Sequence, residues 1–69
     1  MTGDELRAIR ERLNCTGETF ARALDYAGLP QSLQTIVYKF ETGRRNIPEG
    51  VARLAAMFDR YGIPEKIDA

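Results

Sequence analysis

The chain has 69 residues, and its ten lysine and arginine residues are balanced by ten aspartate and glutamate residues. A chain of this length forms one small domain without room for a cofactor fold, and zero net charge excludes a uniformly basic polyanion binder. With one cysteine, Cys15, and no histidine, an intrachain disulfide, a His/Cys zinc site and histidine-based catalysis are excluded. We therefore expect a single domain, residues 1–69, that is not an enzyme and needs no metal or cofactor.

The N-terminal residues 1–13 carry charges throughout, unlike the apolar core of a signal peptide. No apolar run approaches the ~20 residues that a membrane helix requires. We therefore expect a cytoplasmic protein that contacts no membrane.

The first two predicted helices follow candidate capping residues. Asp4 can cap a helix that runs to about Asn14, and Thr16 can cap a second helix that ends before Gly28. Cys15 lies between them, and we expect it to be a small buried residue. The side chains predicted to face inward are Leu6, Ile9 and Leu13 in the first helix and Phe20, Ala21 and Leu24 in the second.

Two longer amphipathic segments follow. Gln31 or Ser32 can cap a third helix that Gly43 ends, and Pro48 suits the first turn of a fourth helix that Gly62 ends. The apolar residues of both recur at i, i+3, i+4 and i+7, which is typical of a helix and not of a strand. These residues are Leu33, Ile36, Val37 and Phe40 in the third helix and Val51, Leu54, Ala55 and Phe58 in the fourth.

The pattern contains no strand, and one further helical turn is expected near Glu65–Ile67. Short helices are marginally stable alone in water, so these must pack on one another through their apolar faces. The sequence therefore predicts an all-α, compact bundle of four to five short helices around one core.

The outer face of the third helix is polar but almost uncharged. It carries Gln31, Gln34, Thr35, Tyr38, Lys39 and Thr42. Amides and hydroxyls pair with base edges in the major groove of DNA, and Arg44, Arg45 and Asn46 follow at once, where they could meet phosphates. Residues 31–48 are also the one basic segment, with three basic residues against one acidic residue. A surface helix with an incidental polar mixture is the alternative explanation.

Three segments resemble the Cro/cI-like (XRE) family of bacterial and phage helix-turn-helix regulators. Residues 6–13 are similar to the family's first helix, and TGETFA at 16–21 with QTIVYKFETGRR at 34–45 resembles its helix-turn-helix. Ile47-Pro48 and Leu54-Ala55 resemble the fourth helix. The resemblance implies a lambda-repressor-like fold and a DNA-binding transcriptional regulator, most simply a homodimeric repressor on a palindromic operator.

The resemblance also implies residue roles. Base contacts would come from Gln34, Thr35, Tyr38 and Lys39, and phosphate contacts from Thr16, Arg22, Arg44, Arg45 and Asn46. Arg10 and Glu41 match positions where many members form a structural ion pair. The family commonly dimerises through the segment after the fourth helix, here 57–69, where the interface residues would be Met57, Tyr61, Ile63 and Ile67.

The sequence departs from the family pattern around the turn of the predicted motif. Gly17 stands where the family usually has glutamine, and Asp25 replaces the usual turn glycine. About six residues, 26–31, lengthen the turn, and we expect Gly28 to take over the role of the turn glycine.

A second class of function is open to the same sequence. A protein-interaction module, such as an antitoxin or a phage inhibitor, could keep the helical scaffold and use an apolar surface for its partner. Zero net charge is compatible with either class. No effector domain is evident, so we expect no small-molecule effector.

Overall fold

The computed structural model describes residues 1–64, so the helical turn predicted near Glu65–Ile67 lies outside the described residues. Within 1–64 the chain forms four helices and no strand. The helices are α1 (Gly3–Arg12), α2 (Gly17–Ala23), α3 (Pro30–Glu41) and α4 (Glu49–Tyr61). The predicted all-α bundle of short helices is therefore confirmed.

The start of α1 is a capping box. The Thr2 hydroxyl accepts a hydrogen bond from the Glu5 amide at 3.1 Å, and the Thr2 amide donates to the Glu5 carboxylate at 2.7 Å. The prediction that Asp4 caps this helix is wrong, because the reciprocal Thr2–Glu5 pair satisfies two amides where one Asp4 cap would satisfy one. Asp4 instead lies in the first turn, where its charge favours the helix dipole.

The first three helices end in the same way. In each, the residue after the C-cap has positive φ, and the next amide donates to the carbonyl five residues back, which is the Schellman arrangement. The residues with positive φ are Asn14 (57°), Asp25 (75°) and Gly43 (79°).

The end of α2 corrects one expectation. Gly28 does not end α2, because Asp25 itself adopts the left-handed conformation directly after the C-cap Leu24, although Gly28 also has a positive φ of 144°. Aspartate tolerates this conformation better than most residues. Gly28 lies farther along the α2–α3 connection, in open space. The predicted Thr16 cap of α2 is confirmed, since its hydroxyl accepts from the Thr19 amide at 3.2 Å.

The start of α3 also differs from expectation. Leu29 is the N-cap and Pro30 is the first helical residue, so Gln31 and Ser32 lie inside the helix. Proline fits the first position because its fixed φ suits a helix and its missing N–H has no partner there. Pro48 lies one residue earlier than expected, as the N-cap of α4, and Gly62 is the C-cap of this helix, as predicted.

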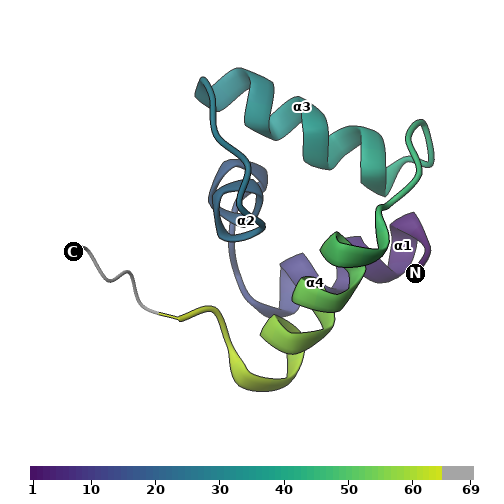
Figure 1. Ribbon diagram of the computed structural model, residues 1–69, viewed down its shortest axis with the longest axis vertical. Helices are drawn as coiled ribbons and strands as arrows, with labels where there is room; N and C mark the ends of the chain where they lie inside the picture. The colour runs from purple at the N-terminus through teal and green to yellow at the C-terminus, as the bar shows by residue number, and fades with distance from the viewer. Residues whose placement is uncertain (65–69) are drawn as a thin grey trace.

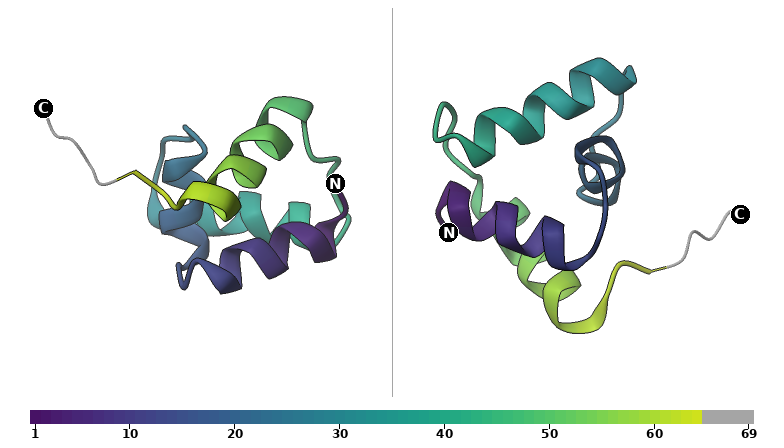
Figure 2. Two further views of the ribbon diagram at one scale, coloured as in Figure 1. Left: turned by 90° about the horizontal axis from the view of Figure 1, so that it is seen from below. Right: turned by 180° about the vertical axis from the view of Figure 1, so that it is seen from behind.

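The core lies where the four helices meet. In Figure 1, α3 runs across the top of the molecule, α2 is seen end-on beneath one end of it, and α1 and α4 lie below the other end. Figure 2 shows from two further sides that α1 and α4 lie side by side, and α1 also contacts α3. The largest fully buried side chains are Phe20, Phe40, Leu6, Leu33 and Val37.

The predicted apolar stripes face this core. Leu33, Val37 and Phe40 of α3 are buried, while Ile36 is half-buried at the edge. Full burial of such a side chain contributes roughly 1.5–3 kcal/mol. The stripe of α4 follows the same pattern, with Leu54 half-buried. Among residues 1–64, no helix is long and apolar enough to cross a lipid bilayer.

Candidate nucleic-acid interface

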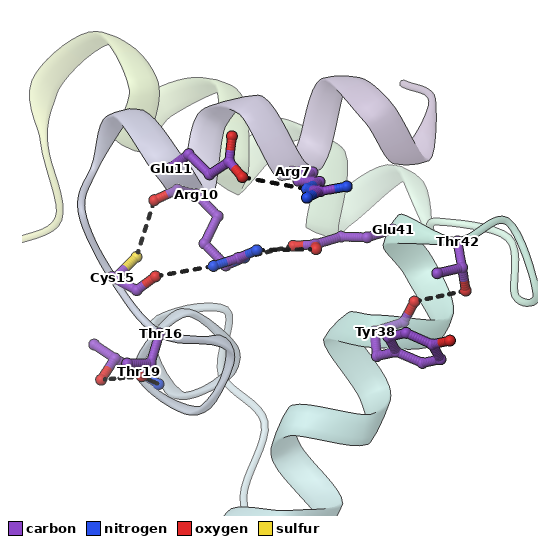
Figure 3. A network of polar contacts seen from close by, with 9 residues as sticks. All are labelled: Arg7, Arg10, Glu11, Cys15, Thr16, Thr19, Tyr38, Glu41 and Thr42. Carbon is purple, nitrogen blue, oxygen red and sulfur yellow. Dashed lines mark hydrogen bonds and ion pairs between the residues drawn. The ribbon is translucent and has the colours of Figure 1, made fainter.

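The outer face of α3 is open to solvent. Gln34, Thr35, Tyr38 and Lys39 are all exposed, and Tyr38 keeps 55% of its surface accessible. Glu41 is the one acidic residue between 26 and 48, and it points away from this face toward α1 (Figure 3). The accessible face of α3 therefore presents amide, hydroxyl, phenol and ammonium groups without a carboxylate.

Two threonine hydroxyls on α3 bond to their own helix. Thr35 Oγ1 donates to the Gln31 carbonyl at 2.9 Å, and Thr42 Oγ1 donates to the Tyr38 carbonyl at 2.8 Å. Each hydroxyl hydrogen is thereby occupied, so Thr35 can offer a ligand an acceptor lone pair and a methyl group. If Thr35 contacts a base as predicted, it would do so through this acceptor or this methyl group.

Two arginines that follow the C-terminal end of α3 lie back against this helix. After Gly43 reverses the chain, the Arg44 and Arg45 amides both donate to the Lys39 carbonyl, at 2.9 and 3.2 Å. The Arg44 guanidinium carbon then lies 5.8 Å from the centroid of the Tyr38 ring. That of Arg45 lies 5.8 Å from the Phe40 ring, which is buried. Asn46 follows, exposed, in the α3–α4 loop.

The distribution of ion pairs separates this end of α3 from the rest of the molecule. Five arginines lie 2.7–3.2 Å from a carboxylate, and these are Arg7, Arg10, Arg12, Arg22 and Arg53. In the described range 1–64, the lysine and arginine side chains without such a partner are Lys39, Arg44, Arg45 and Arg60. Three of these four belong to residues 39–45. Zero net charge therefore conceals a local basic site.

One predicted phosphate contact is weakened by this pairing. Arg22 is exposed on α2 as expected, but its guanidinium lies 3.1 Å from Glu18 of the same helix. A phosphate at Arg22 would have to compete with this carboxylate. The i, i+4 spacing of Glu18 and Arg22 is the sequence signal that reveals the pair.

The first turn of α2 lies directly against α3. A Cβ atom on Gly17 would be 3.6 Å from the Gln34 Cα and 3.8 Å from the Val37 Cβ, which is ordinary contact distance. Thr16 is exposed beside it and caps α2: its hydroxyl accepts from the Thr19 amide at 3.2 Å and donates to the Thr19 hydroxyl at 3.1 Å. Gln34 is exposed next to the N-terminus of α2. Spacing in the sequence gave no sign of this contact.

The predicted ion pair between Arg10 and Glu41 is present (Figure 3). Arg10 Nε and Nη2 donate to the two Glu41 carboxylate oxygens at 2.7 and 3.2 Å, and Nη1 donates to the Cys15 carbonyl at 3.2 Å. The hydrogen bonds to Glu41 raise the pKa of Arg10 above its usual value, although partial burial opposes them. One guanidinium thus ties α1 and the α1–α2 link to the end of α3.

Cys15 lies at the edge of this network. It is half-buried against the core, and its thiol donates to the Arg10 carbonyl at 3.8 Å. Burial is the main cause that raises the pKa of the Cys15 thiol. The neutral thiol is therefore favoured, which agrees with a packing role and not with a reactive thiolate.

The residues predicted for a dimer interface are divided. Met57 and Tyr61 on α4 are 55% and 75% exposed, whereas Ile63 packs against the protein's own core. Ile67 lies outside the described residues. On another side, a groove of about 660 Å³ between α1 and α4 has an alanine-rich floor, Ala8, Ala52 and Ala56, between charged side chains.

Comparison with known proteins found no relative of this chain. No protein-family model matches the chain, and no curated protein or solved structure matches it significantly.

Proposed function

We propose that the chain is a DNA-binding transcriptional regulator that reads a specific double-stranded sequence with α3 in the major groove. The observation that carries this proposal is the arrangement of α3: its apolar side is buried, and its acid-free polar side is exposed beside Lys39, Arg44 and Arg45. The major groove admits an α-helix, and glutamine and lysine pair with adenine and guanine edges there.

The relation of α2 to α3 supports a helix-turn-helix. Figure 3 shows α2 end-on beside α3, so the two helices cross, and Ala21 of α2 is fully buried. A small residue at this position allows close approach of the two helices. Their connection, residues 24–29, is longer than the short turns of many such motifs. The N-terminus of α2 lies beside Gln34, next to the proposed reading face.

A single small module makes few base contacts, so we propose a homodimer on a palindromic operator, acting as a repressor in the cytoplasm without a small-molecule effector. A two-fold dimer doubles the contacts and places half-sites about one helical turn apart. Met57 and Tyr61 are exposed apolar residues on α4, and they supply the proposed dimer surface.

The first test uses duplexes selected by the protein from a pool of random sequences. We expect Gln34→Ala and Lys39→Ala each to weaken the preferred duplex by about 1–3 kcal/mol and to relax base preference, measured by fluorescence anisotropy. Unchanged affinity and preference in both variants would show that α3 does not read the bases.

The second test separates phosphate contacts from base contacts. Arg44→Ala should weaken binding to every duplex and lower the slope of log affinity against log salt by about 0.9. The matched control is Arg53→Ala, because Arg53 is exposed on α4 and already paired with Glu49 at 3.0 Å. Equal effects of the two substitutions would contradict the proposed orientation.

A protein-interaction module is the second candidate function, and the groove between α1 and α4 is the observation that favours it. This groove does not involve the outer face of α3. If the wild-type chain binds no duplex in dilute salt, the regulator proposal fails and the interaction module becomes the better explanation.

A further inference from the structure

Tyr38 and Arg44 form a contact on the exposed side of α3 that the packing of the core does not require. Tyr38 is 55% exposed, and the Arg44 guanidinium carbon lies 5.8 Å from the centroid of its ring. Among residues 1–64, Arg44 has no carboxylate within ion-pair distance. The ring is therefore the side-chain partner of this guanidinium.

The backbone fixes how the two side chains meet. Gly43, with φ of 79°, reverses the chain, and the Arg44 amide donates to the Lys39 carbonyl at 2.9 Å. Arg44 is thereby directed back along α3 toward the turn that carries Tyr38. The Thr42 hydroxyl, which bonds the Tyr38 carbonyl at 2.8 Å, closes the same turn. A fixed helix end thus joins a ring and a guanidinium that are six residues apart.

We propose that Tyr38 is a positioning residue, which holds the Arg44 guanidinium in place for a DNA phosphate and does not itself read a base. This inference rests on the proposed DNA binding. An aromatic ring contacts the face of the planar guanidinium, while the N–H groups at its edge stay free for paired hydrogen bonds to phosphate oxygens. Because the ring already restrains the side chain, Arg44 loses less conformational freedom when it binds.

The neighbouring cations show why this arrangement is particular to Arg44. Arg45 lies over Phe40, whose ring is only 1% exposed, so Arg45 covers the edge of the core. Lys39 lacks the planar group that stacks on a ring. In residues 39–45, Arg44 is therefore the cation whose aromatic partner lies on the solvent-exposed face of α3.

The experiment measures affinity of the full chain for two labelled duplexes, a mixed-sequence duplex and the preferred duplex, by anisotropy in dilute salt. Tyr38→Leu should weaken binding to both duplexes equally, by about two- to tenfold. Without the ring, the Arg44 side chain is free in the unbound protein and must lose that freedom when DNA binds. Tyr38→Phe keeps the ring and should restore affinity on both. Because Tyr38 is exposed, we expect each variant to keep its fold, and thermal melting of each variant checks this.

A double-mutant cycle identifies the partner. In an Arg44→Ala background, Tyr38→Leu should cause no further loss, because the residue being positioned is gone. Additive losses would overturn the proposal, and so would a loss confined to the preferred duplex or one shared by Tyr38→Phe, since both indicate base reading. If wild-type protein binds neither duplex, the proposed function fails as well, whereas wild-type binding that Tyr38→Leu leaves unchanged overturns only the role of Tyr38.

Discussion

The two ends of α3 are held in different ways. At the start, Leu29 caps the helix without a side-chain hydrogen bond and is 67% exposed, and no acidic residue lies in the first turn. At the end, Glu41 is clamped by Arg10, Gly43 completes a Schellman motif, and Gly3 of α1 lies against the last carbonyls. One end is thus anchored to the body of the protein, and the other depends on the contact with α2.

This difference indicates what sets the direction of the outer face of α3. A helix fixed at one end by two hydrogen bonds and close backbone packing cannot rotate about its axis without breaking them. The anchored end is also the basic end, so the backbone that carries Lys39 and Arg44 lies next to the anchor. Three substitutions test this comparison, and a fourth, in α4, serves as a reference away from α3.

The largest effect is expected from Glu41→Ala, which removes the anchor and leaves the Arg10 guanidinium half-buried without its carboxylate. The side chains of this pair are 22% and 10% exposed, so we expect a loss of about 2–3 kcal/mol in the free energy of unfolding, below the range for fully buried pairs. Urea denaturation measures it. Glu41→Gln, which keeps an acceptor for Arg10, should lose less, and equal losses would assign the effect to packing.

Gly3→Ala tests the backbone contact at the same anchored end. An added Cβ would lie 2.6 Å from the Phe40 carbonyl oxygen and closer still to that of Glu41, so α1 must shift away from α3. We expect a loss of about 1–3 kcal/mol. Gly50→Ala is the matched control in α4, since no atom lies within 4 Å of its added Cβ, and it should stabilise by up to ~1 kcal/mol. Similar melting temperatures for the two variants would refute the contact.

Leu29→Ser tests the weakly held end. A serine at the N-cap can accept from the first-turn amides of α3, so we expect a gain of about 0.5–1 kcal/mol in unfolding free energy. Little apolar burial is lost, because Leu29 is largely exposed. Thermal and urea melts measure the gain. A clear destabilisation would mean that Leu29 contributes to packing at this end.

The smallest effect is expected from Asp59→Asn, in the pair that joins α4 to α1 away from α3. The hydrogen bonds from Arg12 hold the pKa of Asp59 below its usual value. Protonation is then harder in the folded state, so the pair stabilises the fold above about pH 4 and this contribution disappears as pH falls through the lowered pKa. Melting temperatures of wild type and variant should differ slightly at pH 7 and converge once the pH is below the lowered pKa of Asp59. A difference in melting temperature that stays constant with pH would show that protonation of Asp59 is not coupled to the stability of the fold.

The sequence was most informative where one period repeats over several turns. The stripes of α3 and α4 place Val37, Phe40, Ala55 and Phe58 in the core correctly, because burial of one helix face is a sum over many residues. The starts of the helices depend on one or two hydrogen bonds, and neighbouring residues compete for them. Thr2 and Asp4 are both good caps, and only the match with Glu5 decides between them.

The candidate site, like the fold, was predicted only in part. Periodicity gave the exposed face of α3, and the family resemblance gave the Arg10–Glu41 pair. Two features depend on which side chains approach each other in three dimensions, and the spacing of the sequence does not show them. These are the position of the Arg44 guanidinium over the Tyr38 ring and the contact of Gly17 with Gln34. Asp25 misled the prediction because the φ preference for glycine is statistical, and aspartate can adopt the same conformation.

The unequal pairing of charges has a consequence for how the molecule would approach a large charged partner. In the described residues, three cations without carboxylate partners gather at the C-terminal end of α3, whereas Asp25, which forms no ion pair, lies at the end of α2, away from them. Such a separation gives an electric dipole moment to a chain whose formal charges cancel. In the field of a polyanion, a torque would turn that end of α3 forward before any contact forms, and added salt would screen this torque.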